Sequence, residues 1–430
     1  MYADKAAKQE NIFYRSKHSP AMVSQAVLEE LTVKIKEARE MLQGVIHVTP
    51  LVSNKTFSDL SGGEVYLKLE NLQKTGAFKV RGAYYKISKL VRTRGVRKVV
   101  TASSGNHAQG VAYSASLLGV EAVVVMPRYT PFYKVNAARG YGARVILHGE
   151  TYDDAYLYAS EIAKKESVPF VHPFDDPDIV AGQGTIGVEI YEQLPDADLV
   201  LVPVGGGGLI SGIAVALKRL SSRVKVIGVQ PRGAPAMYMS YKQGRIVETP
   251  QVFSIADGVI VKKPGELTFS IIQDLVDDMV IVDEKDIARA VFMLLERAKT
   301  VAEPAGALAV AAVLSGSVDV KGKKAVCVVS GGNADPSLLS RIINQVLYLE
   351  GRQVRIRGVL PDRPGQLKRV IDPIAELGFN IVEIEHERLN PLISPGMAQV
   401  TLGLEVPSPD AVERLLLKLK ELGLDFTVVT

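Results

Sequence analysis

Lys79 lies beside Phe78 in a run bracketed by glycines, residues 74–83, and its amine has an obvious chemical use. A lysine amine forms a Schiff base with a carbonyl compound when burial or neighbouring cations leave it partly neutral. A lysine between Phe78 and Val80 is also typical of a helix edge, where the charged end reaches solvent. Other segments of the chain are needed to choose between these interpretations.

Four consecutive glycines, 205–208, stand between an apolar segment that predicts a strand and a segment that predicts a helix. Backbone N–H groups in such a turn can converge on an anion at the helix N-terminus. The dinucleotide pattern G-x-G-x-x-G fails because Ile210 or Ser211 occupies its third glycine, and the P-loop pattern fails because Ile213 replaces its lysine. The run therefore indicates a phosphorylated cofactor smaller than a nucleotide, or a glycine turn with no ligand.

A polar loop, residues 103–107, also follows a predicted strand and precedes a predicted helix. Ligands bind at the carboxyl ends of strands in open α/β sheets, so the loop's N–H groups could hold a substrate carboxylate. The Asn106 amide could donate a hydrogen bond to a hydroxyl group on the ring of a bound cofactor. A histidine such as His107 is more often structural than catalytic. Ser330 ends another buried strand in the same way. Together with Lys79 and the glycine run, the loop specifies pyridoxal phosphate (PLP) acting on an amino acid.

Short apolar segments alternate with longer helical patterns between residues 64 and 351, which predicts an α/β architecture with two parallel sheets. The predicted strands are residues 65–69, 98–101, 122–125, 144–147, 199–203, 225–229 and 325–330. Amphipathic helices are expected over 33–42, 152–166 and 284–300. These strands and helices must bring Lys79 together with the glycine run, the 103–107 loop and the loop at Ser330.

The pattern changes near Glu350, where the order strand–helix–strand–strand–helix–strand predicts a ferredoxin-like βαββαβ domain. Its strands are expected at 354–360, 379–384, 398–406 and 425–429, and its second helix at 409–422. The expected organisation is a polar N-terminal extension over 1–32, a catalytic domain over 33–350 and a small domain over 351–430.

Composition narrows the setting of this 430-residue chain. Its net charge of +4 and lack of a basic stripe argue against a nucleic-acid partner. Cys327 is the single cysteine, which suits a reducing compartment. Residues 1–20 contain no apolar signal region, and no apolar run approaches the roughly 20 residues of a membrane span. We therefore expect a cytoplasmic protein with no membrane partner.

These motifs, in this order, resemble those of the serine/threonine dehydratase family of fold-type II PLP enzymes, whose architecture comprises two open twisted α/β subdomains. The resemblance covers residues 33–350 and includes the segments 77–82, 104–110, 181–185, 205–209 and 330–333. The small domain, with Asp362, Pro364, Gly365 and Leu367 at its first strand-to-helix turn, resembles an ACT domain, an amino-acid-sensing module.

The resemblance implies roles for single residues. Lys79, beside Phe78, would hold PLP as a Schiff base and later remove the α-proton of the substrate. Asn106 would bond the ring hydroxyl, and Ser330 would face the pyridine nitrogen and leave it nearly neutral. The phosphate would be bound by the N–H groups of the glycine run: Gly205, Gly206, Gly207, Gly208 and Leu209. The substrate carboxylate would be bound by Ser103, Ser104, Gly105, Asn106 and His107.

Two positions depart from the family pattern. Ser104 stands where these dehydratases commonly have alanine, and in the related serine racemases that serine is an acid/base on the opposite face of the cofactor. Those racemases bind a divalent metal through an acidic pair, whereas this chain has Gln230, Ala234 and Ala236 there. We therefore expect no metal site and leave racemisation open.

The resemblance implies a PLP-dependent L-threonine ammonia-lyase that produces 2-oxobutanoate and also acts on L-serine. Isoleucine or valine would regulate it through the ACT-like domain, at a site including Asp362, Pro364, Gly365, Leu367 and Asn380, and it would be a homodimer or homotetramer. The alternatives are a serine racemase/dehydratase and a catalytically silent amino-acid sensor. The small domain could also serve assembly alone.

Overall fold

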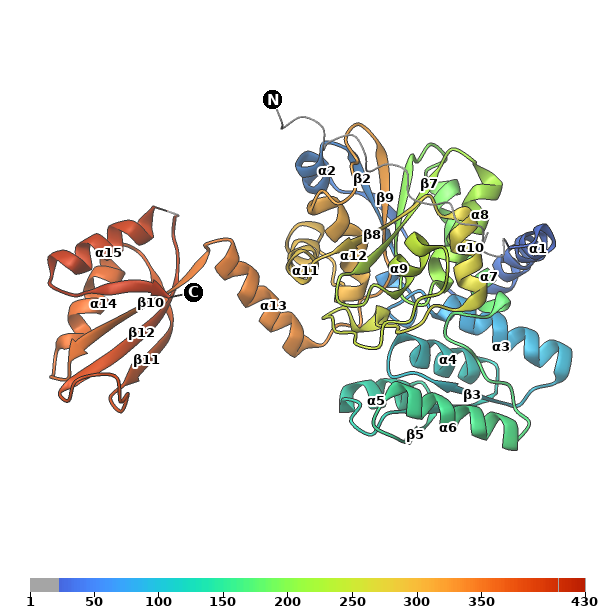
Figure 1. The fold of residues 1–430 in the computed structure, drawn as a ribbon, viewed down its shortest axis with the longest axis horizontal. Helices are drawn as coiled ribbons and strands as arrows, with labels where there is room; N and C mark the ends of the chain where they lie inside the picture. Colours follow the sequence, from blue (N-terminus) through green and yellow to red (C-terminus); the bar gives the residue numbers. More distant parts are fainter. Residues whose placement is uncertain (1–22, 409, 430) are drawn as a thin grey trace, which may run out of the picture. The chain divides into compact units, whose positions relative to one another are not determined.

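The computed structural model describes residues 23–408 and 410–429 (Figure 1). The chain divides into two compact units, Met1–Ala334 and Asp335–Thr430. The division precedes the boundary expected near Glu350, because helix α13 (Pro336–Leu349) groups with the C-terminal unit. Each unit has its own hydrophobic core.

The larger sheet of the first unit has six strands in the order β1-β2-β9-β6-β7-β8. All neighbours in it are parallel except β1, which pairs antiparallel with β2. The continuous apolar runs of its strands follow from burial on both faces. The strands are β1 (Leu51–Ser53), β2 (Glu64–Leu69), β6 (Leu199–Pro203), β7 (Lys225–Pro231), β8 (Asp278–Val282) and β9 (Lys324–Val329).

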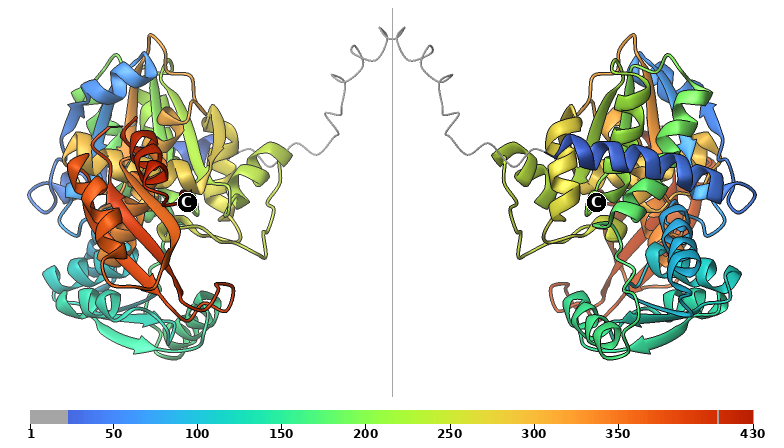
Figure 2. Two further views of the ribbon diagram at one scale, coloured as in Figure 1. Left: turned by 90° about the vertical axis from the view of Figure 1, so that its left-hand side faces the viewer. Right: turned by 90° about the vertical axis from the view of Figure 1, so that its right-hand side faces the viewer.

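Helices cover both faces of this sheet (Figures 1 and 2). One face carries α2 (Lys55–Ser61), α11 (Glu284–Ala298) and α12 (Pro304–Leu314). The other face carries α8 (Gly208–Leu220), against which α1 (Gln25–Leu42), α7 (Pro177–Gln193) and α10 (Glu266–Leu275) pack. The shorter α9 (Ala236–Gln243), η1 (Glu70–Leu72) and η2 (Asp257–Val259) lie in connections.

A second, three-stranded parallel sheet has the order β3-β4-β5. Its strands are β3 (Lys98–Ala102), β4 (Glu121–Met126) and β5 (Arg144–Leu147), and its helices are α4 (Asn106–Leu117), α5 (Phe132–Gly140) and α6 (Tyr152–Lys165). Helix α3 (Val80–Arg94) packs against α4 of this subdomain and also against α7. Lys79 begins α3 and therefore lies where the two subdomains meet.

The structure moves the start of one predicted helix and adds two strands that the sequence did not predict. Helix α1 begins at Gln25 rather than near residue 33, because Leu31, Ile35 and Leu42 share one buried face of it. The polar extension expected over 1–32 therefore loses its last residues to this helix, and residues 1–22 lie outside the described part. Strands β1 and β8 were not predicted, since β1 has three residues and β8 keeps partly exposed positions.

The C-terminal unit has the predicted order β10 (Gln353–Pro361), α14 (Gln366–Glu376), β11 (Asn380–Glu387), β12 (Met397–Glu405), α15 (Ala411–Glu421) and β13 (Phe426–Val429). Its antiparallel sheet has the order β11-β12-β10-β13, with both helices on one face (Figure 1). Buried apolar residues from the strands and both helices form its core. This is the ferredoxin-like arrangement.

Within the described residues, every helix is too short or too polar to cross a bilayer.

Candidate active site

Lys79 is the N-cap residue of α3 and follows a tight turn at Gly76, whose φ is +70°. A Cβ at Gly76 would lie 2.4 Å from Oδ1 of Asn333, so the turn requires glycine for space as well as conformation. The Lys79 Nζ donates to the carbonyl of Pro173 at 2.7 Å and lies 5.2 Å from the Phe78 ring centre. Burial lowers the pKa of this amine to about 8, while Glu303 opposes the shift. A substantial neutral fraction is therefore available near physiological pH.

The loop that ends at Ser330 lies directly against the lysine turn. The Phe78 N–H donates to the Ser330 carbonyl at 3.2 Å, and Ala77 forms an isolated antiparallel bridge with Gly331. Ser330 itself is buried at the carboxyl end of β9. The structure thus brings Lys79 and Ser330 together, although they are far apart in the sequence.

Asn106 links a second loop to the same place through both ends of its side-chain amide. Its Nδ2 donates to Oε1 of Glu303 at 2.6 Å, and its Oδ1 accepts from Nδ2 of Asn333 at 2.8 Å. The Asn333 Nδ2 also donates to the Thr75 carbonyl at 2.8 Å. Three segments therefore converge on Asn106 at the start of α4.

Glu303 was not predicted as a site residue. It is buried, with 6% of its surface exposed, and precedes Pro304 at the N-terminus of α12. Burial, reinforced by Asp257, raises its pKa to about 7 against the opposing effects of Asn106, Lys134 and Lys79. The available signal was a lone carboxylate before the otherwise apolar helix 304–314, which first-turn preferences explain without invoking a site.

The 103–107 loop forms the entry to α4. The Gly105 N–H donates to the Ser103 Oγ at 3.2 Å, and the Ser104 Oγ lies 3.3 Å from Oγ1 of Thr130. The His107 ring instead points inward, with Nε2 at 3.0 Å from the Val171 carbonyl. Burial, with the Lys79 charge, lowers the pKa of His107 to about 3, so its imidazole is neutral. The His107 side chain is therefore structural, and its backbone N–H is the part that belongs to the loop.

The glycine run connects β6 to the N-terminus of α8, where Gly207 has a φ of +95°. A Cβ at Gly206 would lie 2.4 Å from atoms of the Phe174 ring, and one at Gly208 would lie 3.0 Å from the Phe174 backbone. The Thr268 Oγ1 donates to the Gly206 carbonyl at 2.7 Å, and this hydrogen bond fixes the orientation of that peptide. With Leu209 in the first turn of α8, the run forms an N–H cradle suited to a phosphate.

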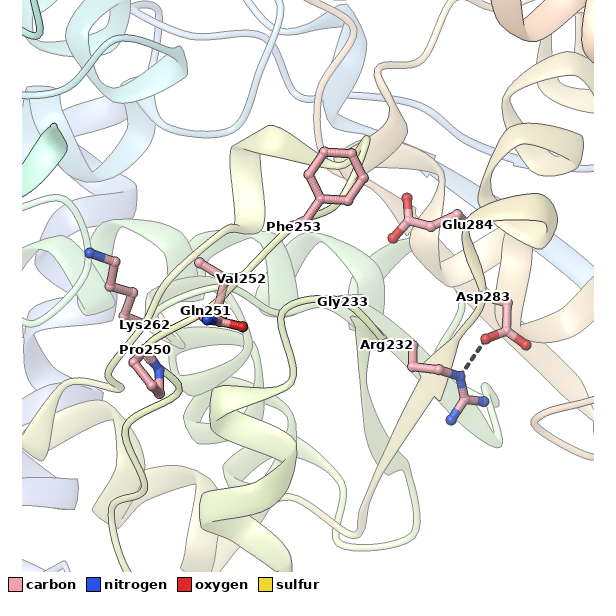
Figure 3. Close-up of a pocket in the computed structure, with 9 residues that line it drawn as sticks. All are labelled: Arg232, Gly233, Pro250, Gln251, Val252, Phe253, Lys262, Asp283 and Glu284. Atoms are coloured by element: carbon pink, nitrogen blue, oxygen red, sulfur yellow. Dashed lines mark hydrogen bonds and ion pairs between the residues drawn. The ribbon is translucent and has the colours of Figure 1, made fainter. Parts of the chain in front are cut away.

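One pocket lies apart from this constellation. A pocket at the carboxyl ends of β7 and β8 contains the Arg232–Asp283 ion pair and the exposed Phe253 ring, but none of the predicted site residues (Figure 3). Gln230 accepts a hydrogen bond from the Tyr238 N–H at 2.7 Å. Among the described residues, no group of three or more His, Cys, Asp or Glu side chains is placed to hold a metal.

Comparison with known proteins identifies the family. The family model for pyridoxal-phosphate dependent enzymes matches residues 42–331. This chain belongs to the pyridoxal-phosphate dependent enzymes. The PLP enzyme is 50% identical to the L-threonine ammonia-lyase of Thermotoga maritima over 381 residues, covering 89% of this chain and 95% of the relative.

Some relatives cover less of the chain. The catabolic L-threonine dehydratase of Escherichia coli K12 is 46% identical over 310 residues, or 72% of this chain and 94% of its own length. Among solved structures, processed threonine deaminase isoform 2 from Solanum lycopersicum has a TM-score of 0.72 and 38% identity, covering 77% of this chain and 91% of that one. Maize serine racemase has a TM-score of 0.69 and 34% identity, covering 74% and 98%.

The residues of this PLP enzyme fit its cofactor. The glycine run has no space for side chains and presents helix N–H groups, as a phosphate requires, and the Lys79 amine is partly neutral, as a Schiff base requires. Ser330 stands at the lysine turn, and the neighbouring Gly331 carbonyl accepts from the Glu303 N–H at 3.1 Å.

Proposed function

We propose that this chain is a PLP-dependent L-threonine ammonia-lyase, which converts L-threonine to 2-oxobutanoate and ammonia and also converts L-serine to pyruvate. The observation that carries the proposal is the 50% identity to an L-threonine ammonia-lyase over 89% of the chain. The convergence of Lys79, Asn106, Ser330 and the glycine run supports it. In the overall reaction one water is lost from the substrate and one is consumed in releasing ammonia.

Bound PLP would supply an aldehyde for the substrate amine and an electron-withdrawing ring that stabilises negative charge at the α-carbon. Lys79 would hold the cofactor, and its freed Nζ would then accept the α-proton. The glycine run and Leu209 would bind the phosphate, with Phe78 and Asn106 beside the ring. The N–H groups of the 103–107 loop would orient the substrate carboxylate, which fixes the α-proton relative to Lys79.

Ser330 would face the pyridine nitrogen. A serine there would leave the ring nearly neutral and weaken its withdrawal of electrons, which favours loss of the β-hydroxyl over transamination. Glu303 would position Asn106. Its carboxylate accepts a hydrogen bond from the Asn106 amide, which would keep that amide aligned with the cofactor ring.

The C-terminal unit would be an ACT-like domain through which isoleucine or valine regulates the enzyme. The turn between β10 and α14 would bind the effector: Gly365 has a φ of +87° at the start of α14, and Asp362 pairs with Arg388 at 3.2 Å. Asn380 donates to Glu405 at 2.9 Å on the neighbouring strand, while Pro364 and Leu367 flank the turn. We place the protein in the cytoplasm as a homodimer or homotetramer.

Product assays on L-threonine and L-serine test the proposal. The purified protein should be yellow, form 2-oxobutanoate from threonine, and lose both colour and activity in Lys79→Ala. Borohydride reduction should attach the cofactor to Lys79. A colourless protein unchanged by added PLP would support a silent sensor instead.

Serine racemisation is a second candidate activity, favoured by Ser104 and by the 34% identity to maize serine racemase. The Ser104 Oγ lies 3.3 Å from the Thr130 hydroxyl, and a proton could exchange between the two groups. Ser104→Ala should abolish formation of D-serine from L-serine while elimination continues. Loss of both activities together would rule out a separate role for Ser104 as the second base.

A further inference from the structure

Four charged side chains are buried together in a group that includes Arg81, in the first turn of the helix that Lys79 caps: Lys68, Glu70, Arg81 and Glu189. Lys68, Glu70 and Arg81 have no exposed surface, and Glu189 is 7% exposed. Two cations and two anions balance in this group, which we call the buried charge cluster.

Hydrogen bonds fix the guanidinium of Arg81 on all sides. Its Nε and Nη2 donate to the two Glu70 oxygens at 2.8 and 2.7 Å. Its Nη1 and Nη2 donate to the two Glu189 oxygens at 2.6 and 2.9 Å, and Nη1 also donates to the Thr185 hydroxyl at 3.1 Å. The five N–H donors of arginine form a rigid planar fork, so this set of acceptors defines a single orientation.

Lys68 completes the cluster from the neighbouring strand β2. Its Nζ donates to Glu189 at 2.6 Å, to the Thr49 carbonyl at 2.7 Å and to Gln193 at 3.0 Å. These acceptors account for all three ammonium protons. The cluster thereby ties β2, η1 and α7 to the first turn of α3.

The same turn is held closely by backbone packing. A Cβ at Gly182 of α7 would lie 2.5 Å from the Cα of Gly82, and one at Gly110 of α4 would lie 3.1 Å from the carbonyl carbon of Lys79. Pro173, whose carbonyl accepts a hydrogen bond from the Lys79 Nζ, lies in the segment leading into α7. The element that holds Arg81 is therefore continuous with the segment that meets Lys79.

A buried ion cluster adds little net stability compared with apolar residues of similar size, because removing charges from water offsets their attraction. It does impose one geometry. We propose that the buried charge cluster is a positioning device, which fixes the first turn of α3 and thereby the direction of the Lys79 side chain toward the cofactor. This inference rests on the proposed function only in treating Lys79 as the cofactor lysine.

Arg81→Lys in the PLP-loaded enzyme tests the inference, because lysine keeps the charge but loses the fork. We expect kcat per bound cofactor to fall roughly tenfold to a hundredfold, with KM for threonine unchanged. The visible circular dichroism of bound PLP, which reports how the lysine and the ring are oriented, should also change. That signal needs no turnover, so it remains informative if threonine proves not to be the substrate.

Lys86→Met is the matched control. Lys86 also joins α3 to the start of α7, through Asp176 at 2.8 Å and Asp178 at 3.1 Å, but farther from Lys79. The Lys86→Met variant should have a lower midpoint of thermal unfolding, with kcat and the visible circular dichroism unchanged. The inference is overturned if Arg81→Lys behaves in the same way as this control. Should Arg81→Lys fail to fold, the nearly isosteric Glu70→Gln is judged by the same two measurements, and Thr185→Val after it.

Discussion

Lys79 and Glu303 have pKa values shifted toward each other, to about 8 and about 7. Burial is the main cause in both cases, because it disfavours the charged form of each group. Lys79 is also among the opposing influences on Glu303, and Glu303 on Lys79. At this residue scale, a small change in pH alters the charge of the site near neutrality.

In the PLP-free protein the Lys79 amine should lose its proton at a lower pH than an ordinary lysine. We expect the rate of Schiff-base formation with added PLP to rise through a midpoint near pH 8, well below the ordinary lysine value of 10.5. Stopped-flow absorbance across a pH series measures this rate. Glu303→Gln should move the midpoint lower, since it removes the negative charge that favours the ammonium; an upward shift would contradict this account.

Glu303 should also make stability depend on pH. Its carboxyl keeps its proton in the folded state up to about pH 7, whereas the unfolded chain releases it near 4.5. The folded state binds more protons in this window, so the stability of the unsubstituted protein should fall relative to Glu303→Gln as pH rises from 4.5 to 7. The relative change should approach about 3 kcal/mol at most.

Urea unfolding of both PLP-free proteins at pH 5 and pH 7.5 gives this difference directly. The exposed Glu161→Gln is the control and should show no comparable change. A pH-independent difference between the Glu303→Gln variant and the unsubstituted protein would show that Glu303 is ionised throughout the range.

At the scale of elements, the β6–turn–α8 unit shows why the glycine run is specific. Gly206 and Gly208 are required by the approach of Phe174, and Gly207 by its positive φ. The sequence predicted the strand, the turn and the helix, because an apolar segment, four glycines and an apolar helix follow one another. It did not predict Phe174, which reaches the run from the segment before α7.

Gly206→Ala should therefore weaken PLP binding at least about tenfold, because the new methyl group would overlap the Phe174 ring and force the cradle open. Equilibrium titration of the PLP-free protein with PLP measures the change. Gly140→Ala is the control, since a Cβ there meets nothing within 4 Å and should leave binding unaffected. Equal affinities in the two variants would argue against this run as the phosphate cradle.

At the scale of the whole molecule, relatives differ in how much of this chain they cover. The Escherichia coli catabolic dehydratase aligns over 94% of its own length with 72% of this chain, whereas the Thermotoga maritima L-threonine ammonia-lyase covers 89%. The C-terminal unit has a core of its own. We propose that this unit serves regulation or assembly.

Isoleucine or valine should shift the threonine saturation curve of the full chain to higher concentrations if the C-terminal unit senses amino acids. Asn380→Ala should abolish the shift without altering the curve measured in the absence of effector, because Asn380 lies in the C-terminal unit. Lys420→Ala, at an exposed position of α15, is the control and should respond normally. Identical curves with and without either amino acid would leave assembly as the role of this unit.

The sequence by itself determined the alternation of strands and helices, the βαββαβ order and the loops at strand ends, since these depend on local periodicity and on glycine. It could not predict Glu303, whose hydrogen bond to Asn106 spans 197 positions, or the pairing of Arg81 with Glu189 across 108. It also left the direction of His107 open, which burial beside Val171 decided. Which charged groups lose their contact with water depends on how distant elements pack, so only the tertiary structure decided which carboxylate faces Lys79 and which charges hold its helix.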